Sequence, residues 1–358
     1  MIDSDADDTP DLSALLKRHA ELETLFGDGD GGRFLSGWQC ENPWNETLRN
    51  RITTIRAMLP DDRYQYFSDD NALIADSFME FHRNVDRKIP SAILCGEGAS
   101  SLIFTACAWL KTKGIEEVHY IPPLYFTAHF ALKLLGIRAR AVSGRHAFEH
   151  GFTMNLPPAN TVLMLSDPVW YAGVKVKRSV VERIIDWQRE TGSFVFVDGS
   201  FQYMEWNSTP YESTAELDPC RTIRIICPTK TLALHGYRFA YATLPKELLG
   251  DFSHYYGSVY GSASAESIAF ARVAAAAVHE HKITSGLVGI ASERYGQMRT
   301  TGKISADWQA ECGYFVFEKI IAELPQDLML MNGSFFEQRR FHDHYRINLL
   351  SPSIGLLG

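Results

Sequence analysis

One lysine stands in the middle of an uncharged stretch of the sequence. Lys230 lies in CPTKTLALHGYRFAY, residues 227–241, where the next cation is Arg238. An ammonium group in an apolar stretch costs desolvation energy, so such a lysine usually reaches solvent with its head group or is kept for its chemistry. A primary amine that has lost its proton can attack an aldehyde. The stretch alone leaves both a solvent-reaching lysine and a reactive amine open.

Polar side chains also follow two other segments that have the composition of strands. Asp198 comes directly after FVFV, and a carboxylate at a buried strand end needs a cationic partner unless it only caps the next turn. In CGEGASSLIF, residues 95–104, a glycine turn precedes Ala99 and Ser100, which open a helix. The free N–H groups of a helix start suit a phosphate, although ordinary capping explains this pattern equally well. Together with Arg238, these residues supply an amine for an aldehyde, a carboxylate for a ring nitrogen and a site for a phosphate. Pyridoxal phosphate has all three of these groups.

These residues need a scaffold that brings the ends of several strands to one edge. Short apolar segments predict strands at 117–121, 161–165, 194–197, 222–227 and 238–243. Amphipathic segments between and after them predict helices at 100–113, 126–136, 178–191 and 264–281. This alternation predicts a mainly parallel sheet covered by helices on both faces. Ligands of such sheets bind at the carboxyl ends of the strands, where Asp198 and Lys230 fall.

Both ends of the chain depart from this alternation. Residues 12–26 and 46–59 have helical periodicity and predict an N-terminal arm packed on the rest of the protein. Towards the C-terminus, GYFVFEKI, IIAEL, LMLMNGSFF and YRINLL predict a small strand-helix-strand unit. The sequence therefore predicts an α/β protein in three parts. Residues 1–60 would form an arm and part of a small domain, residues 61–285 a large cofactor-binding domain, and residues 286–358 a small α+β domain.

Composition argues against several classes of protein. The chain has 358 residues, a formal net charge of -8 and scattered basic residues, so nothing predicts binding to nucleic acid or to an anionic membrane surface. No apolar run approaches the about 20 residues of a membrane-spanning helix, and the start MIDSDADDTPD is unlike a signal peptide, so we expect a cytoplasmic protein. The cysteines form no CxxC pair, and DGDGG at 28–32 lacks the Glu that closes a calcium loop. We therefore expect reduced thiols and no metal site.

On these residues the chain resembles the fold-type I pyridoxal-phosphate enzymes, specifically the class I/II aminotransferase family, from about residue 40 to the end. The lysine segment of that family has a Ser or Thr before the lysine, a Gly six positions after it and an Arg eight after it, which matches Thr229, Lys230, Gly236 and Arg238. Further motifs of the family match, in sequence order, the turn at 98–100, Tyr125 in PPLYF, Asp198 in VDGSF and Arg346 in YRINLL. The resemblance implies a seven-stranded type of sheet and pyridoxal 5'-phosphate as the cofactor.

The resemblance also implies a role for each matched residue. Lys230 would form the Schiff base with the cofactor and, once released, move the proton at Cα of an amino acid. Arg346 would hold the α-carboxylate, and Asn42 of ENPW would belong to a loop that closes over the substrate. The family works as a homodimer, in which Tyr66 of the neighbouring subunit would reach the phosphate. The remaining cofactor contacts would be made by Gly98, Ala99, Ser100, Tyr125, Asp198, Ser200, Thr229 and Arg238.

Three positions depart from the pattern of the family. Trp170 and Phe201 stand where the family has an Asn and a Tyr that donate hydrogen bonds to the phenolic oxygen of the cofactor, and Cys227 replaces a phosphate-binding Ser. Trp170 could supply an indole donor, and Tyr203 could reach the cofactor or the substrate. The resemblance implies an aminotransferase acting on an α-amino acid. The departures leave open a lyase, cyclase or oxidase reaction on an unusual amino acid without amine transfer, and a regulatory relative that only binds the cofactor.

Overall fold

A sheet of seven strands is the largest element of the structure. The computed structural model describes residues 33–60, 70–206, 211–325, 328–336 and 341–357, and four single positions before residue 33. The strands are β1 (Ala92–Gly96), β2 (Glu117–Tyr120), β3 (Arg138–Ala141), β4 (Val162–Ser166), β5 (Phe194–Gly199), β6 (Thr222–Ile226) and β7 (Ala240–Leu244). Their order across the sheet is β1-β7-β6-β5-β4-β2-β3, and only β7 runs antiparallel to its neighbours. The prediction of a mainly parallel sheet is confirmed.

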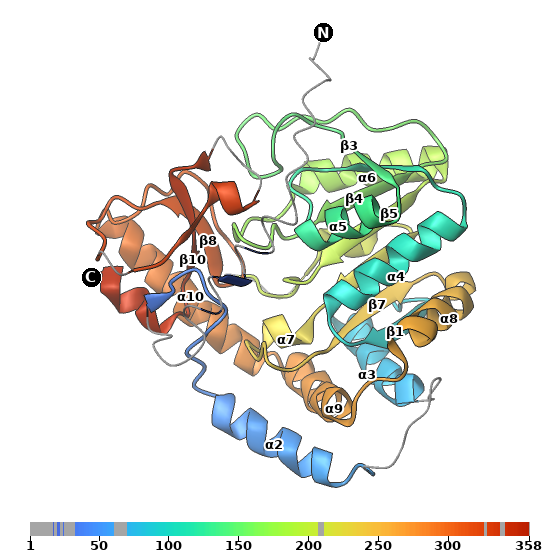
Figure 1. Cartoon of the computed structure of the whole chain (residues 1–358), viewed down its shortest axis with the longest axis horizontal. Helices are drawn as coiled ribbons and strands as arrows, with labels where there is room; N and C mark the ends of the chain where they lie inside the picture. The colour runs from blue at the N-terminus through green and yellow to red at the C-terminus, as the bar shows by residue number, and fades with distance from the viewer. Residues whose placement is uncertain are drawn as a thin grey trace.

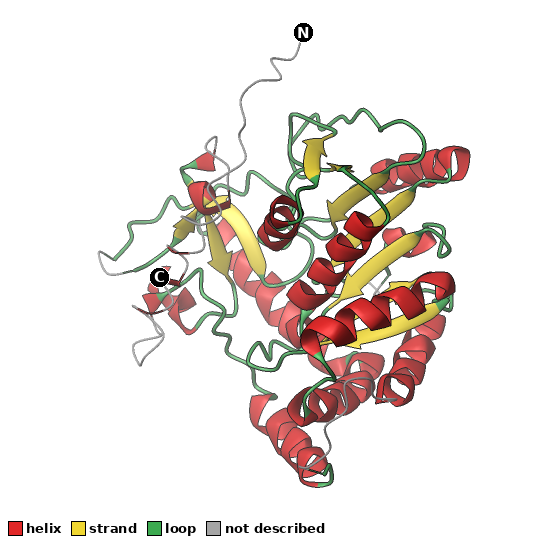
Figure 2. Cartoon of the chain, turned by 45° about the vertical axis from the view of Figure 1, so that its right-hand side comes forward, coloured by secondary structure: helices red, strands yellow, loops and turns green. Residues whose placement is uncertain are grey.

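Helices cover both faces of this sheet (Figure 2). In β4, Val162 and Met164 belong to the apolar core on one face, and Leu163 and Leu165 to the core on the other, because successive side chains of a strand point in opposite directions. The first face carries α4 (Ala99–Thr112), α5 (Phe126–Leu134) and α8 (Leu249–Tyr260). The second carries α3 (Asp70–Val85), α6 (Arg178–Thr191) and α9 (Ala265–Glu280). The four predicted helices correspond to α4, α5, α6 and α9.

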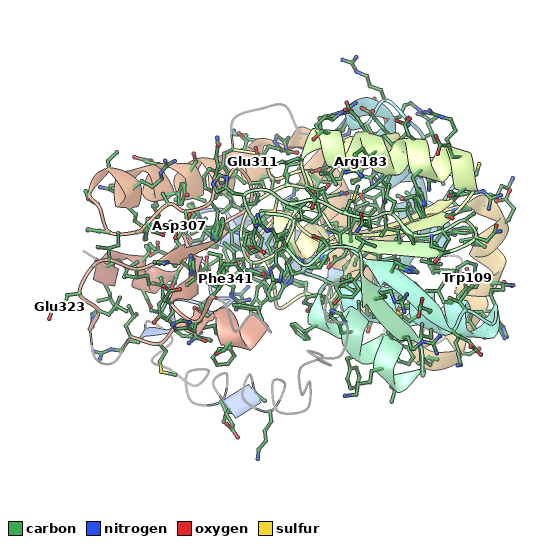
Figure 3. All side chains as sticks on the ribbon, turned by 90° about the horizontal axis from the view of Figure 1, so that it is seen from above. Trp109, Arg183, Asp307, Glu311, Glu323 and Phe341 are labelled. Atoms are coloured by element: carbon green, nitrogen blue, oxygen red, sulfur yellow. The ribbon has the colours of Figure 1, made fainter. Side chains whose placement is uncertain are left out.

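A smaller antiparallel sheet forms a second part of the molecule (Figure 1). It consists of β8 (Phe315–Lys319), β10 (His344–Asn348) and β9 (Met331–Asn332), in that order. The long helix α10 (Lys282–Thr300) precedes it in the chain. In Figure 3, which views the molecule from above, labelled residues of the two parts lie on opposite sides: Asp307, Glu323 and Phe341 on the side of the small sheet, and Trp109 and Arg183 on the side of the large one.

The prediction of a helix at IIAEL, residues 320–324, is wrong. Ile320 forms an isolated bridge with Ile304, and no helix follows before Pro325. Five residues before a proline are too few for a stable helix, and the helix of this part is α10, which comes before the strands. The predicted domain boundary at 285 falls inside α10. At the N-terminus α2 (Asn45–Ala57) confirms the predicted helix at 46–59, whereas most of 12–26 lies outside the described residues.

Residues 33–42 run alongside the small sheet before α2 begins. The side-chain amide of Asn348, at the end of β10, donates to the carbonyl of Gly37 at 2.9 Å and to that of Gln39 at 2.8 Å. In Figure 1 this blue segment passes close to β10 on its way to α2. The two hydrogen bonds flank Trp38 and hold its backbone at the junction of the two parts.

A half-buried lysine pairs with two buried carboxylates in the large part. Lys175 Nζ lies 2.5 Å from Glu205 Oε1 and 2.9 Å from Glu212 Oε2, and both carboxylates are buried. Burial disfavours the ammonium, but the carboxylates of Glu212, Glu205 and Asp167 outweigh it and raise the pKa of Lys175. The lysine is therefore charged and holds carboxylates that would otherwise be unpaired.

A buried carboxyl group also lies in the small sheet. Glu318 of β8 accepts hydrogen bonds from the Tyr295 hydroxyl at 2.9 Å, from Ser305 Oγ at 3.2 Å and from the backbone of Asp307 at 2.7 Å. Burial raises its pKa to about 7 in spite of these donors. Glu318 therefore changes its charge near neutral pH.

None of the helices in the described residues is long and apolar enough to cross a membrane. Within the same ranges, no three His, Cys, Asp or Glu side chains gather where they could hold a metal ion. All six cysteines are free thiols.

Candidate active site

A pocket lies at the edge of the large sheet where the parallel strands end. Most of its walls come from the ends of β1, β2, β4, β5 and β6 and the segments after them. Arg238 joins them from the start of β7 because that strand runs in the opposite direction. Eleven residues named from the sequence as cofactor or catalytic residues line it: Gly98, Ala99, Ser100, Tyr125, Trp170, Asp198, Ser200, Cys227, Thr229, Lys230 and Arg238. The other lining residues are Phe201, which the sequence marked as a departure, and Trp38, His235 and Tyr237, which no motif marks.

One end of the pocket has the character of an anion site. Gly98 caps α4 with a φ of 83°, and no side chain caps this helix, so the backbone N–H groups of its first turn are available to a ligand. A Cβ atom at Gly98 would lie 2.9 Å from Nη2 of Arg238. The glycine therefore lets the guanidinium approach the helix start, where both contribute positive charge.

Asp198, the last residue but one of β5, also lines the pocket. Its Oδ1 accepts hydrogen bonds from Ser200, at 2.6 Å from the hydroxyl and 3.2 Å from the backbone N–H. Burial raises the pKa of Asp198, while Ser200 and the charge of Lys230 act in the opposite direction. A cationic group bound beside Asp198 would supply the partner that a buried carboxylate needs.

Lys230 lies in α7 (Pro228–Thr231), one helical turn that follows β6. Burial lowers the pKa of its amine from 10.5 to about 8, and the charges of Arg238 and Arg346 act in the same direction. A lysine with this pKa loses its proton far more readily than a solvated one, and the neutral amine is the form that attacks an aldehyde. Of the two interpretations that the sequence left open, the geometry supports the reactive amine.

His235 and Tyr314 close a ring of hydrogen bonds around this lysine. Lys230 Nζ lies 3.2 Å from His235 Nδ1, His235 Nε2 lies 3.0 Å from the Tyr314 hydroxyl, and that hydroxyl donates to the Lys230 carbonyl at 3.1 Å. Burial, with the charges of Lys230 and Arg346, lowers the pKa of His235 well below its ordinary value of 6.5. His235 was visible in the sequence as the one ionisable side chain between Lys230 and Arg238 besides Tyr237.

Trp38 covers the Lys230 amine from another side. The centroid of its ring lies 3.7 Å from Lys230 Nζ and 4.9 Å from Cζ of Arg346, so the indole contacts both cations. Its edge also meets Phe315 of β8 at 5.0 Å between centroids. The residue that separates the two cations thus comes from the N-terminal segment.

Arg346, predicted to hold a carboxylate, is fully buried beside the pocket and is not among its lining residues. Its Nε donates to the Ser36 carbonyl at 3.0 Å, and its Nη2 contacts the same carbonyl. Its Cζ lies between 4.8 and 5.6 Å from the centres of four aromatic rings, which belong to Trp38, Trp170, Phe315 and Phe336. Two of these rings, Trp38 and Trp170, also line the pocket.

Aromatic and thiol groups occupy the positions that depart from the family. Trp170 meets Tyr125 edge-on at 5.3 Å between ring centroids. Phe201 also lines the pocket, so an apolar ring stands where the resemblance would place a hydroxyl. The Cys227 thiol lies 3.0 Å from Thr229 Oγ1 and 3.5 Å from the Phe239 carbonyl, where it can act as a weak donor.

The two sheets and their helices together match solved aminotransferase structures. An aspartate aminotransferase from Thermotoga maritima superposes with a TM-score of 0.75 over 97% of this chain and 96% of that chain, at 14% identity. A probable N-succinyldiaminopimelate aminotransferase from Thermus thermophilus gives 0.73 over 97% and 96% at 15% identity. YbdL from Escherichia coli, described with a methionine aminotransferase function, gives 0.73 over 97% and 94% at 14% identity. This is the aminotransferase fold. No family model and no curated protein matches the sequence itself, so the likeness establishes the fold alone.

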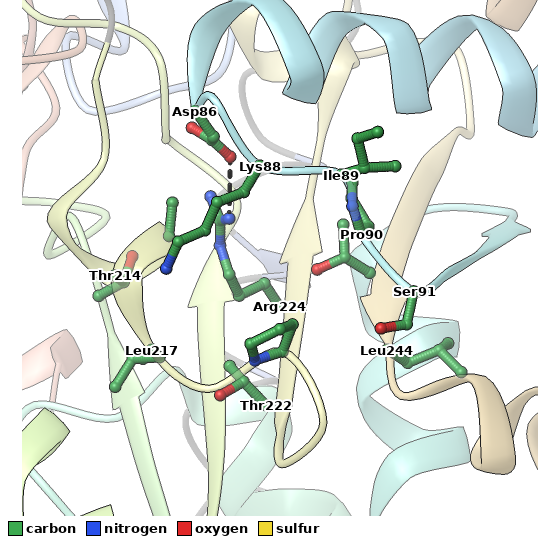
Figure 4. A pocket seen from close by; sticks show the side chains of 13 residues that line it. Asp86, Lys88, Ile89, Pro90, Ser91, Thr214, Leu217, Thr222, Arg224 and Leu244 are labelled. Atoms are coloured by element: carbon green, nitrogen blue, oxygen red, sulfur yellow. Dashed lines mark hydrogen bonds and ion pairs between the residues drawn. The ribbon is translucent and has the colours of Figure 1, made fainter.

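Within the aminotransferase fold, Tyr203 does not reach the pocket, which corrects the expectation that it could contact cofactor or substrate. Its hydroxyl donates to Asp86 Oδ2 at 2.8 Å and accepts from Arg224 Nη2 at 2.6 Å. Figure 4 shows Asp86 and Arg224, joined at 3.0 Å, at a second pocket near the start of β6, the strand whose other end leads to Lys230. A buried ion pair needs further hydrogen bonds, and the Tyr203 hydroxyl supplies one.

Two other predicted residues also lie outside the lining of the pocket. The amide of Asn42 donates to the Leu232 carbonyl at 2.8 Å, and its oxygen accepts from the backbone of Trp44 at 2.9 Å. Asn42 thus ties the N-terminal loop to the end of α7 instead of facing a ligand. Tyr66 lies outside the described residues.

The chemistry of the pocket fits pyridoxal phosphate. An uncapped helix start beside Arg238 suits the phosphate. The buried Asp198 carboxylate suits a protonated ring nitrogen, and the Lys230 amine of lowered pKa suits an aldehyde. These groups lie in one cavity, as the aminotransferase fold requires of its strand ends.

Proposed function

We propose that the chain is a pyridoxal-phosphate-dependent enzyme that carries out aminotransferase chemistry on an α-amino acid. The observation that carries this proposal is the joint presence of the Lys230 amine, the Asp198 carboxylate and the α4 start with Arg238 in one pocket. When bound, the cofactor supplies an aldehyde for the substrate amine and a ring that accepts electrons from Cα. The shared aminotransferase fold supports the proposal.

The residues in and beside the pocket have the chemistry for distinct roles. Asp198 would bind the ring N–H, and the first turn of α4 would bind the phosphate together with Arg238. The ring of Tyr125 offers a face for stacking. Lys230 Nζ, with its lowered pKa, takes up the proton that leaves Cα of the substrate. Arg346 binds the substrate carboxylate once Trp38 has moved aside.

The quaternary structure and the location belong to the same proposal. We propose that two copies of the chain form a cytoplasmic homodimer in which Tyr66 of one copy contacts the phosphate bound by the other. The resemblance of DRYQYFSDDNAL to the corresponding family segment supports this arrangement. A Tyr66→Phe variant should bind the cofactor more weakly than the unaltered dimer, and a monomeric active protein would contradict the proposal.

Spectroscopy with candidate amino acids tests the reaction. The purified protein loaded with pyridoxal phosphate should convert the cofactor to its pyridoxamine form and release an equal amount of 2-oxo acid, and an added 2-oxo acid should reverse the change. A Lys230→Ala variant should lack the visible absorbance of the lysine-bound cofactor. Product without the pyridoxamine form would favour a lyase, cyclase or oxidase reaction. Visible absorbance that persists in Lys230→Ala would overturn the assignment of Lys230.

A further inference from the structure

The ring of hydrogen bonds around Lys230 fixes the tautomer of His235. The Tyr314 hydroxyl has one proton, and the Lys230 carbonyl at 3.1 Å can only accept, so the proton points to that carbonyl. The hydroxyl oxygen then accepts from Nε2–H of His235 at 3.0 Å. Nδ1 of the neutral imidazole therefore carries a lone pair and accepts from the Lys230 amine at 3.2 Å.

The surroundings of His235 keep the imidazole neutral. Burial and the two nearby cations oppose its protonation. The Cys40 thiol lies 3.7 Å from Nε2, and burial raises the pKa of this thiol to about 12, so no thiolate attracts a proton there. Among the described residues, only His235 forms a hydrogen bond with Lys230 Nζ. The other charged or titratable groups that act on this amine, without a hydrogen bond to it, are Asp198, Cys227, Arg238, Arg346 and Cys40.

Trp38 and His235 together restrict how the amine can be oriented. A neutral amine has two N–H bonds and one lone pair besides its bond to Cε. One N–H points to His235 Nδ1, and the face of the Trp38 ring at 3.7 Å attracts the second. The lone pair is left for the remaining direction, and Lys230 lines the same cavity as Asp198 and Tyr125.

We propose that His235 is a positioning residue that holds the Lys230 amine with its lone pair directed into the pocket. The inference rests on the proposed function, in which this amine meets an aldehyde. A nucleophile that is aligned before its partner arrives reacts faster, and a misplacement of about 1 Å can cost about a hundredfold in rate. The neutrality of the imidazole is part of the role, because a protonated Nδ1 would no longer accept and would repel an ammonium group.

Two matched variants separate this role from simple packing. Asn places its amide oxygen at the position of Nδ1 relative to the backbone, so His235→Asn retains the acceptor that faces Lys230. Gln reaches the position of Nε2 instead, so His235→Gln retains a group near Tyr314 and loses the acceptor. Both side chains are polar, uncharged amides, and the main difference between them is where the acceptor lies.

The readout is the rate at which cofactor-free protein, mixed with pyridoxal phosphate, gains the visible absorbance of the lysine-bound cofactor. We expect His235→Gln to load at least about tenfold more slowly than the unaltered protein and His235→Asn to stay within about threefold of it. Pyridoxamine phosphate, which has no aldehyde, should bind both variants with the unaltered affinity, which shows that the pocket is intact.

Three results would overturn the positioning role of His235: loading of His235→Gln at the unaltered rate, slow loading of both variants alike, or loss of pyridoxamine phosphate affinity in His235→Gln. A failure of the proposed function looks different. In that case the unaltered protein itself would gain no visible absorbance with pyridoxal phosphate, or Lys230→Met would gain it equally well.

Discussion

Replacing Lys230 by Met should make the stability of the cofactor-free protein less dependent on pH in the alkaline range. The amine has a pKa of about 8 in the folded protein and 10.5 ordinarily, a difference that corresponds to roughly 3 kcal/mol. Lys230 keeps some exposure to the pocket, so screening reduces this to about 2 kcal/mol. Because the folded pKa is lowered, the folded state binds fewer protons between these values, and the stability of the unaltered protein rises with pH across this window. Met has no proton to lose and lacks this contribution.

The loss of two contacts offsets the gain from removing the charge. The cation–π contact with Trp38 and the hydrogen bond to His235 each contribute about 1 kcal/mol, so the two proteins should have similar stability near neutral pH. Denaturant unfolding at about pH 7 and about pH 10, after removal of any cofactor, isolates the contribution of proton binding at Lys230 to the free energy of unfolding. The unaltered protein should gain about 2 kcal/mol relative to Lys230→Met between the two conditions. An equal difference at both pH values would refute a lowered pKa at Lys230.

Three further predictions concern stability and the anion site. Lys175→Met should lower the free energy of unfolding by about 3 to 5 kcal/mol in denaturant unfolding, because it leaves buried carboxylates unpaired. Arg189→Met, at an exposed ion pair, should change the free energy of unfolding little, and equal losses in the two variants would contradict this account. Gly98→Ala should weaken binding of inorganic phosphate in calorimetry, since its Cβ would meet the Arg238 guanidinium, whereas Gly236→Ala has open space and serves as the control. Glu318→Gln should flatten the pH dependence of stability. Because the pKa of the Glu318 carboxyl is raised to about 7 in the folded protein, the unaltered protein should lose roughly 3 kcal/mol of stability as the pH rises from about 4.5 to about 7. An unchanged profile in the variant would refute a raised pKa.

The sheet and most of the pocket lining were predictable because both depend on local order along the chain. A strand buried on both faces is a continuous apolar run, and FVFV shows this together with the carboxylate that ends it. The polar residues of a parallel sheet that bind ligands follow such runs, so Asp198 and Lys230 could be assigned to one edge before the structure was known. Predicting these residues does not require knowledge of how the two parts of the molecule pack.

The features that were missed depend on that packing. Tyr314 joins the hydrogen-bond ring from 84 positions beyond Lys230 in the chain, in the turn before β8. Tyr203 sits close to Asp198 in sequence, yet the buried Arg224 and Asp86, 138 positions apart from each other, take its hydroxyl. No local sequence pattern predicts contacts over such separations, because these contacts form only when elements distant in the chain pack together.

The indole of Trp38 lies where a substrate of the proposed function would bind. Under the proposed function, an α-amino acid, which carries its amine and carboxylate on one carbon, would have to reach Lys230 and Arg346 together, and the indole lies against both. The apparent affinity for any such ligand is then its intrinsic affinity reduced by the fraction of molecules whose indole has withdrawn. That fraction depends on how firmly Asn348 holds the backbone on either side of Trp38. Under the proposed function, Asn348, a residue outside the pocket lining, would therefore weaken the binding of every amino acid by the same factor, through the energy needed to release a short stretch of chain.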